Sequence, residues 1–297
     1  MFTEPDRGDP IHNLQDWKRR LLPAYNATIH QSRRIAALAG ALARGRVGRC
    51  VVCGRWAPLL LRPGVIAPEL VRRWELPPRL VAAFIRKESL ECAWCGASLR
   101  VRRLAETIIN LYPAGQAHSI AAWVAQPEVR GLRIAEINAI EGLTSYLTRL
   151  PYHSYSEYQP ENEVRHEDLS HLTYLDESFD LVLTSETLEH VPDLDRALTE
   201  IRRVLAPDGR HIFTVPWRPD VPRSFARATL DGDGRFQPLG LPIHHPGGDV
   251  GYPVFTEIGL DFPSRLHDAG FDVEVRFGPL SMDNVAQVCV TTKRVDP

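Results

Sequence analysis

The chain has 297 residues, of which 44% are hydrophobic and 24% charged, and its formal net charge is −2. These values are ordinary for a soluble globular protein. The sequence contains no run of about 18 apolar residues, and its acidic, polar start differs from a secretory signal. We therefore expect a cytoplasmic protein with no membrane partner.

The charges are unevenly distributed along the chain. Residues 1–103 carry 19 Lys+Arg and 8 Asp+Glu. The remainder of the chain carries 16 Lys+Arg and 29 Asp+Glu. Opposite charges of this kind attract each other within one molecule or between two, and a basic surface can also face nucleic acid. We favour a solvated Arg-rich surface packed against an acidic domain, because net charge governs association and not mechanism.

Residues 14–44 have apolar side chains at helical spacing, and Pro23 divides them into two predicted helices. Their polar faces are basic, which suits helices that lie against something else. The pattern predicts a helical segment over residues 1–47. This segment either docks on the domain that follows or lines the interface of a homodimer.

Two CxxCG motifs follow, and they contain four of the five cysteines: Cys50, Cys53, Cys92 and Cys95. Four thiolates from two such turns satisfy a tetrahedral Zn²⁺ and close the site to water. The 38 residues between the motifs exceed the common spacing of about 15–20 and predict one or two short helices. We expect a structural zinc ribbon over residues 48–103.

Disulfides and a redox CxxC pair are the alternatives to zinc. Nothing in the sequence indicates an oxidising compartment, and two matched motifs favour four thiolates acting together. The fifth cysteine, Cys289, lies in an apolar run and is expected in the core.

From residue 104 onward, short apolar runs alternate with helical patterns. This alternation predicts a doubly wound α/β domain over residues 104–297, with helices on both faces of the sheet. Ligands of such folds bind at the carboxyl ends of the strands. The expected strands are Leu132–Ile137, Tyr152–Tyr158, Val164–Leu169, Asp180–Leu183, His211–Pro216 and an antiparallel pair, Val273–Phe277 and Val285–Thr292.

The most informative segment is FDLVLTSETLEHVPDLDRALTEIRRVLAPDGRHIFTVPW, residues 179–217. It predicts a buried strand, a helix that Pro192 and Asp193 start and that stops at Pro207–Gly209, and a second strand. The segment resembles the fourth and fifth strands of class I S-adenosylmethionine-dependent methyltransferases. The resemblance implies a Rossmann-like sheet of seven strands, S-adenosylmethionine as cofactor, and methyl transfer.

In this family the first strand ends in an acid and a Gly-rich turn, E-x-G-x-G-x-G. Here Glu136 and Gly142 match, whereas Asn138 and Ile140 replace two glycines. Asn tolerates a left-handed backbone, so the first replacement is mild. A β-branched side chain at position 140 stands where the family keeps the backbone bare. Another path of the loop, another mode of cofactor binding, or loss of binding would each account for it.

The resemblance also implies roles for acids after the next strands. Glu157 stands where the family places the acid that accepts hydrogen bonds from the ribose hydroxyls. Asp168 matches the residue that meets the adenine amino group, and the backbone NH of Leu169 meets a ring nitrogen. Glu186 would lie beside the methionine moiety. The alternative for Glu157 and Asp168 is that they are solvated loop acids.

Together with the two CxxCG motifs, the element Val254–Asp261 (VFTEIGLD) narrows the resemblance. The chain is similar to a bacterial subgroup of methyltransferase type 11-like proteins with an N-terminal zinc ribbon. Members of that subgroup are often associated with glycan or natural-product gene clusters.

Three histidines are candidates for acid–base chemistry. His190 follows the fourth strand, and His244 and His245 lie in a Gly/Pro-rich loop that could cover the acceptor. Each has a pKa near neutrality and can serve as a base. The alternative is that all three only hydrogen-bond within turns.

The sequence thus favours methyl transfer to an oxygen or nitrogen of a small-molecule, sugar or natural-product acceptor. Two other functions stay open. A nucleic-acid methyltransferase would grip phosphates with the basic N-terminal part, although few aromatic residues accompany the basic ones there. A catalytically silent fold could act as a binding or assembly module, which the Asn138 and Ile140 replacements favour.

Overall fold

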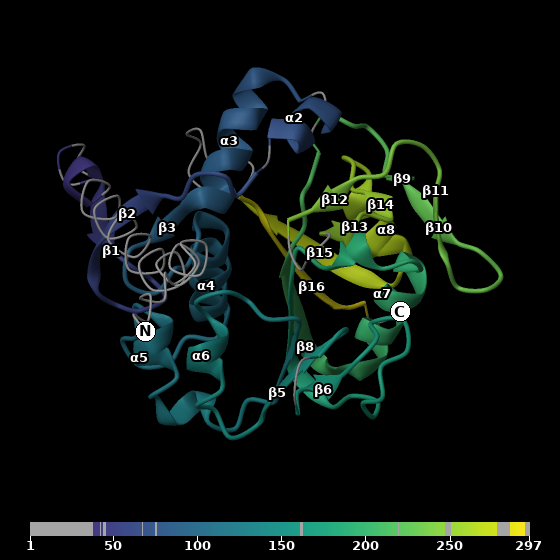
Figure 1. Ribbon diagram of the computed structural model, residues 1–297. Coiled ribbons are helices and arrows are strands. Elements are labelled where there is room, and N and C mark those ends of the chain that lie inside the picture. The colour runs from purple at the N-terminus through teal and green to yellow at the C-terminus, as the bar shows by residue number, and fades with distance from the viewer. Residues whose placement is uncertain are drawn as a thin grey trace, which may run out of the picture.

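The computed structural model describes residues 38–41, 43, 46–66, 68–74, 76–160, 163–218, 220–246, 251–277 and 286–294 (Figure 1). Most of the expected N-terminal helical segment lies outside these residues, as does Val285 at the start of the last expected strand. In the part of the chain that is described, we find no helix with the length and hydropathy that a membrane crossing requires.

A single seven-stranded sheet organises the fold, in the order β15-β16-β8-β7-β4-β5-β6. The strands from β6 to β8 are parallel to their neighbours, and β16 runs antiparallel to both β8 and β15. This order confirms the doubly wound sheet and the antiparallel pair expected at its end. The strands are β4 (Ile134–Ile137), β5 (His153–Glu157), β6 (Arg165–His166), β7 (Phe179–Ser185), β8 (Leu205–Thr214), β15 (Phe271–Arg276) and β16 (Val288–Lys293).

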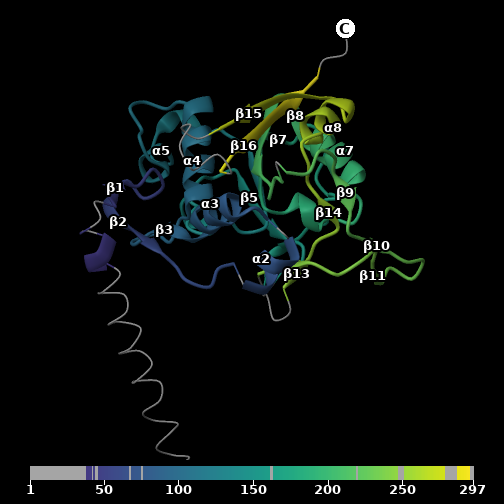
Figure 2. The same cartoon turned by 90° about the horizontal axis from the view of Figure 1, so that it is seen from above.

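Helices cover both faces of the sheet, with α4, α5 and α6 on one face and α7 and α8 on the other (Figures 1 and 2). Along β7, Leu181 and Leu183 enter one core and Val182 enters the other. Strands buried on both faces are apolar at successive positions, which explains the run in the sequence. The helices are α4 (Leu99–Leu111), α5 (Ile120–Trp123), α6 (Thr144–Leu147), α7 (Leu194–Val204) and α8 (Phe262–Asp268), with 3-10 turns η1 (Pro127–Val129) and η2 (Leu188–His190).

Helix α7 is formed largely as its sequence indicates, except at its end. The Asp193 carboxylate accepts a hydrogen bond from the Arg196 NH at 2.9 Å and caps the first turn. The helix ends at Val204, so the expected stop at Pro207–Gly209 is wrong. Strand β8 has already begun at Leu205, and the Pro-Asp-Gly residues lie where its pairing with β7 shifts register.

The cysteine motifs belong to a small antiparallel sheet, β1-β2-β3. Two helices, α2 and α3, connect β2 to β3, as the long spacing between the motifs predicts. Cys50 and Ala97 of this ribbon share one buried cluster with Leu104 of α4 and Ile134 of β4. Helix α4 itself crosses the expected domain boundary at residue 103. The elements are β1 (Val47–Arg49), β2 (Trp56–Leu61), α2 (Pro68–Trp74), α3 (Pro78–Ser89) and β3 (Leu90–Cys92).

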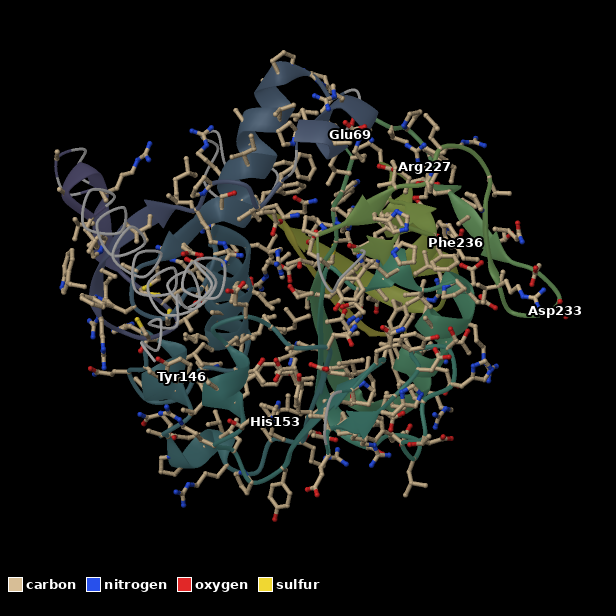
Figure 3. All side chains as sticks on the ribbon, in the orientation of Figure 1. Glu69, Tyr146, His153, Arg227, Asp233 and Phe236 are labelled. Carbon is tan, nitrogen blue, oxygen red and sulfur yellow. The ribbon has the colours of Figure 1, made fainter. Side chains whose placement is uncertain are left out.

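Three two-stranded antiparallel sheets are formed by residues that follow β8 in the chain (Figure 1). His244 and His245 form one of these strands, β12, and do not lie in the open loop that the sequence suggested. In Figure 3, Arg227 and Phe236 mark this region, where the Phe236 ring packs edge-on against Phe255 at 5.5 Å. The pairs are β9 (Phe225–Ala226) with β14 (Thr256–Glu257), β10 (Ala228–Leu230) with β11 (Phe236–Pro238), and β12 (His244–His245) with β13 (Tyr252–Pro253).

A buried histidine in β8 predicts acid sensitivity. His211 is fully buried and bonded to Thr184 at 2.9 Å, and burial lowers its pKa to about 3. The unfolded chain binds this proton near pH 6.5, so stability present above that pH is lost as the pH falls towards 3. In this pH range the unfolding free energy of the wild type falls with decreasing pH. We expect this slope to be smaller in His211→Gln, by up to about 1.4 kcal/mol per pH unit.

Denaturant unfolding at several pH values measures that slope. His267→Gln is the matched control, because His267 is exposed on α8. Equal slopes for the wild type and His211→Gln would contradict the assignment.

Candidate cofactor site and metal centre

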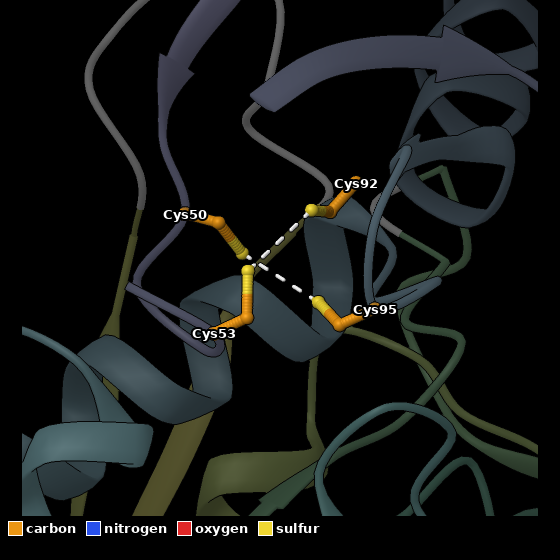
Figure 4. A group of neighbouring side chains, drawn as sticks. All are labelled: Cys50, Cys53, Cys92 and Cys95. Atoms are coloured by element: carbon orange, nitrogen blue, oxygen red, sulfur yellow. Dashed lines mark hydrogen bonds between the residues drawn. The ribbon is translucent and has the colours of Figure 1, made fainter. Parts of the chain in front are cut away.

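The four cysteines of the two motifs converge on one point (Figure 4). The sulfurs of Cys50 and Cys95 are 3.8 Å apart, as are those of Cys53 and Cys92. Ligands about 2.3 Å from a tetrahedral zinc ion lie about 3.8 Å from one another. All four cysteines are free of disulfides. The cluster therefore fits a tetrahedral Zn²⁺, and the disulfide alternative is not formed here.

The second cysteine turn packs directly on the loop after β4. Gly142 has a φ of +79°, and a Cβ at this position would lie 2.7 Å from the Cys95 carbonyl oxygen and 3.0 Å from the Ala97 nitrogen. Only glycine permits this approach without displacement of the ribbon. The glycine that the sequence assigned to the cofactor turn is thus also the docking point of the ribbon.

Glu136 organises the start of the same loop from within the core. Its fully buried carboxylate accepts hydrogen bonds from the Thr144 hydroxyl at 2.6 Å and from the Ile140 NH at 3.2 Å. On its other oxygen it pairs with His153 of β5 at 2.9 Å, a residue labelled in Figure 3. A buried acid needs such partners, and here they fix the path of the loop.

The backbone of Asn138 and the burial of Ile140 explain how these two residues can stand where the family has glycines. Asn138 has a φ of +64°, the left-handed conformation a glycine would have, and its side-chain oxygen accepts from the Tyr158 NH at 3.1 Å. The Ile140 side chain is 1% exposed and packs in the core beneath the loop. The comparison of motifs suggested that the Ile140 side chain stands over the strand ends. In the structure it points into the core instead.

Two acids lie where β5 and β6 end, and the residue after the first of them contacts Asn138. The Glu167 NH donates to the Glu157 carbonyl at 3.1 Å, and the Glu157 carboxylate accepts from the Tyr155 hydroxyl. Asp168 is half-buried and caps a turn by accepting from the Ser170 NH at 2.8 Å. The Leu169 side chain is buried in the second core. Glu157 and Asp168 thus lie at the ends of adjacent strands.

At the end of β7, Glu186 meets two cations from the N-terminal part of the chain. Lys87 of α3 is 1% exposed, and its ammonium lies 3.1 Å from the Glu186 carboxylate. Arg100 of α4 bonds to Glu88 at 2.9 Å and also donates to Ser185. Burial and the neighbouring Glu88 raise the pKa of Glu186, although Lys87 opposes this shift.

Neither Lys87 nor Arg100 was a candidate from the sequence. Both lie in basic helical stretches of the sequence, and the same pattern is typical of helix faces exposed to solvent. Neither residue belongs to a recognisable motif. Only the packing of α3 and α4 against the strand ends brings their charges to the site.

Two of the three candidate histidines come together, and the third does not join them. His190 Nε2 and His245 Nδ1 are 3.2 Å apart, and each lies 3.4 Å from Oε1 of the buried Glu189. His244 instead faces Phe236, with ring centroids 6.0 Å apart. Burial lowers the pKa of His190, and the Glu189 charge opposes the shift. Glu189 itself was missed, although it directly precedes His190 in the sequence.

Comparison with known proteins agrees with this architecture. Residues 140–213 match the family model described as "Methyltransferase domain". A demethylmenaquinone methyltransferase from Lactobacillus johnsonii is 48% identical over 52 residues, which cover 18% of this chain and 21% of that protein. An uncharacterized 37.1 kDa protein in a transposon of Streptomyces fradiae is 34% identical over 114 residues, 35% of this chain and 33% of that protein. The chain thus matches a third or less of the length of either relative.

Among solved structures, an S-adenosylmethionine-dependent methyltransferase from Mesorhizobium loti is 20% identical with a TM-score of 0.39, covering 59% of this chain and 95% of that one. The seven-stranded sheet has the order expected for the class I fold, and residues 140–213 within it match the methyltransferase-domain model. In this protein that domain carries an N-terminal four-cysteine ribbon.

The contact at Gly142 generates a mutational prediction. Gly142→Ala places a Cβ against the Cys95 carbonyl and forces a left-handed alanine, at a cost of about 1–3 kcal/mol. We expect a lower unfolding midpoint and faster loss of metal to a chelator. Gly131→Ala is the control, because no heavy atom lies within 4 Å of its added Cβ. Identical behaviour of the two variants would refute the docking role.

Proposed function

We propose that the protein transfers a methyl group from S-adenosylmethionine to an oxygen or nitrogen of a small-molecule, sugar or natural-product acceptor. The observation that carries the proposal is the methyltransferase-domain match over residues 140–213, together with the acids at the ends of β5 and β6. The glycan and natural-product classes rest on the resemblance of the whole sequence pattern.

The residues present fit the adenosine half of the cofactor. In this assignment Glu157 would accept hydrogen bonds from both ribose hydroxyls, because a carboxylate offers only acceptors and vicinal hydroxyls offer donors. Asp168 would accept a hydrogen bond from the adenine amino group, and the Leu169 NH would donate one to a ring nitrogen. Asn138 supports the arrangement, since its left-handed backbone and its bond to the Tyr158 NH join the ends of β4 and β5.

The methionine half is a zwitterion, and the charges at the end of β7 are of both signs. Glu186 is suited to the ammonium group, and Lys87 and Arg100 to the carboxylate. The ion pairs among these three side chains would then exchange for pairs with the ligand. Glu136 and Gly142 act indirectly, by holding the loop against the ribbon.

When bound, S-adenosylmethionine supplies an electrophilic methyl group. The chain's own part is to orient the acceptor, exclude water and take the proton that the acceptor oxygen or nitrogen gives up. His190, His244 and His245 are the candidates for that base. His190 is held by a hydrogen bond between Nδ1 and the Pro253 carbonyl at 2.8 Å, which directs Nε2 towards His245.

A catalytically silent fold is the second candidate. Close packing of Gly142 on the ribbon favours it, because part of the expected cofactor turn already has a protein partner. Nucleic-acid methylation receives less support, since Lys87 and Arg100 of the basic part are engaged in ion pairs. A homodimer and a cytoplasmic location stay predictions.

Calorimetry with S-adenosylmethionine and S-adenosylhomocysteine tests the enzyme proposal. We expect micromolar binding, weakened roughly tenfold or more by Glu157→Ala and by Asp168→Ala through loss of charge-assisted hydrogen bonds. Glu128→Ala, at an exposed position in η1, is the control and should bind as the wild type does. Absence of binding by the folded wild type would favour the silent fold.

For the ribbon we propose a structural zinc ion held by Cys50, Cys53, Cys92 and Cys95. Cys53→Ser should lower the zinc content by one equivalent and lower the unfolding midpoint, because a structural site contributes folding free energy. Cys289→Ser, in the core of β16, should keep its zinc. Elemental analysis of the purified variants decides, and unchanged zinc in Cys53→Ser would rule out the four-cysteine site.

A further inference from the structure

The cluster of Glu189, His190 and His245 has a shape that its own hydrogen bonds do not explain. The three facing atoms, Glu189 Oε1, His190 Nε2 and His245 Nδ1, form a nearly equilateral triangle with sides of 3.2, 3.4 and 3.4 Å. Ligand atoms 2.0–2.1 Å from a tetrahedral metal lie about 3.3–3.4 Å apart. The triangle therefore has the dimensions of one face of a metal coordination sphere.

The orientation of His190 agrees with a ligand role. A carbonyl oxygen only accepts, so the 2.8 Å contact with Pro253 assigns the proton to Nδ1. The neutral imidazole then directs the lone pair of Nε2 into the triangle. Metal-binding histidines commonly donate their other NH to a backbone carbonyl or carboxylate in this way.

Glu189 supplies an independent observation. Its side chain is 0% exposed, and among the described residues neither carboxylate oxygen has a hydrogen-bond donor in acceptable geometry. Burial lowers the pKa of Arg100, and the charges of Glu88 and Glu186, with a smaller effect from Glu189, raise it above its ordinary value. The hydrogen bonds of Arg100 go to Glu88 and Ser185 and not to Glu189. A buried carboxylate without hydrogen bonds is costly, and a cation in the triangle would compensate it.

A direct hydrogen bond between the two imidazoles is the competing explanation. It satisfies His190 Nε2, but the 3.4 Å contact of His245 Nδ1 with Glu189 Oε1 is then a weak interaction at most, and Oε2 has no hydrogen-bond donor among the described residues. A cation accounts for all three sides together.

We propose that Glu189, His190 and His245 bind a divalent transition-metal ion, for which Zn²⁺ is the best match. Two imidazoles and one carboxylate are a known zinc donor set, whereas Mg²⁺ prefers oxygen ligands alone. The ion would fasten the β12–β13 hairpin to the end of β7, because His245 and Pro253 belong to the hairpin and Glu189 follows β7.

Three protein ligands leave a fourth position for water or for an oxygen of the acceptor. This last role rests on the proposed methyl transfer, and it makes His190 and His245 ligands, with His244 as the remaining base. Metal binding itself does not depend on the methyl-transfer proposal.

The test is the zinc content of the full chain, purified from zinc-supplemented cultures and measured by elemental analysis. We expect two equivalents in the wild type, one in the ribbon and one in the triangle. Glu189→Gln and His245→Ala should each fall to one equivalent. His244→Ala is the matched control in the same strand and should keep two, and an excess of Mg²⁺ should displace neither ion.

A wild type with one equivalent, or equal contents in Glu189→Gln and His244→Ala, would overturn the proposal. Should the variants fail to fold, the wild type from cobalt-supplemented cultures still decides. Cobalt in the ribbon gives thiolate charge-transfer absorption. We expect the total cobalt content to exceed this thiolate-bound cobalt by one equivalent, which is the ion in the triangle. Only thiolate-bound cobalt would refute the second site. Calorimetry with S-adenosylmethionine separately tests the methyl-transfer proposal, so the two failures are distinguishable.

Discussion

The contact between Gly142 and the backbone of Cys95 and Ala97 is the constraint on which the rest of the site depends. It places the second cysteine turn within van der Waals distance of the loop that follows β4. The loop is held from below by Glu136, so it lies between the four-cysteine ribbon and a buried carboxylate. The ribbon and the sheet also share one hydrophobic core, so this contact lies within a continuous packed interior. The four-cysteine cluster and the loop at the strand ends are therefore in contact through a few backbone atoms.

The charges carried by α3 and α4 complete this junction. A buried ion pair such as Lys87–Glu186 adds little to stability, because desolvation offsets the attraction. Its removal on one side only is costly, since the other charge stays buried. Such pairs therefore act to fix one orientation of α3 and α4 on the sheet. They also leave a cluster of mixed charge at the end of β7.

The sequence predicted the sheet and the four-cysteine cluster because both depend on local patterns. A few adjacent residues are enough to predict a strand from an apolar run such as Asp180–Leu183, or a cysteine cluster from paired CxxCG turns. The burial of Ile140 was not predictable, since the direction of one side chain depends on the packing of the whole core around it. The roles of Lys87 and Glu189 arise from contacts across the fold, with Glu186 and with His245, which no local pattern records. The assignments of individual cofactor-site residues stay predictions.

The brevity of β6 affects how copies of the protein meet one another. An edge strand offers unpaired backbone groups to any other strand, and long apolar edges promote aggregation. Here one edge of the sheet has two residues, Arg165 and His166, both exposed. At the other edge, β15 carries Asp272, Glu274 and Arg276. One edge strand is short and the other is charged. Both features disfavour the pairing of edge strands between two molecules.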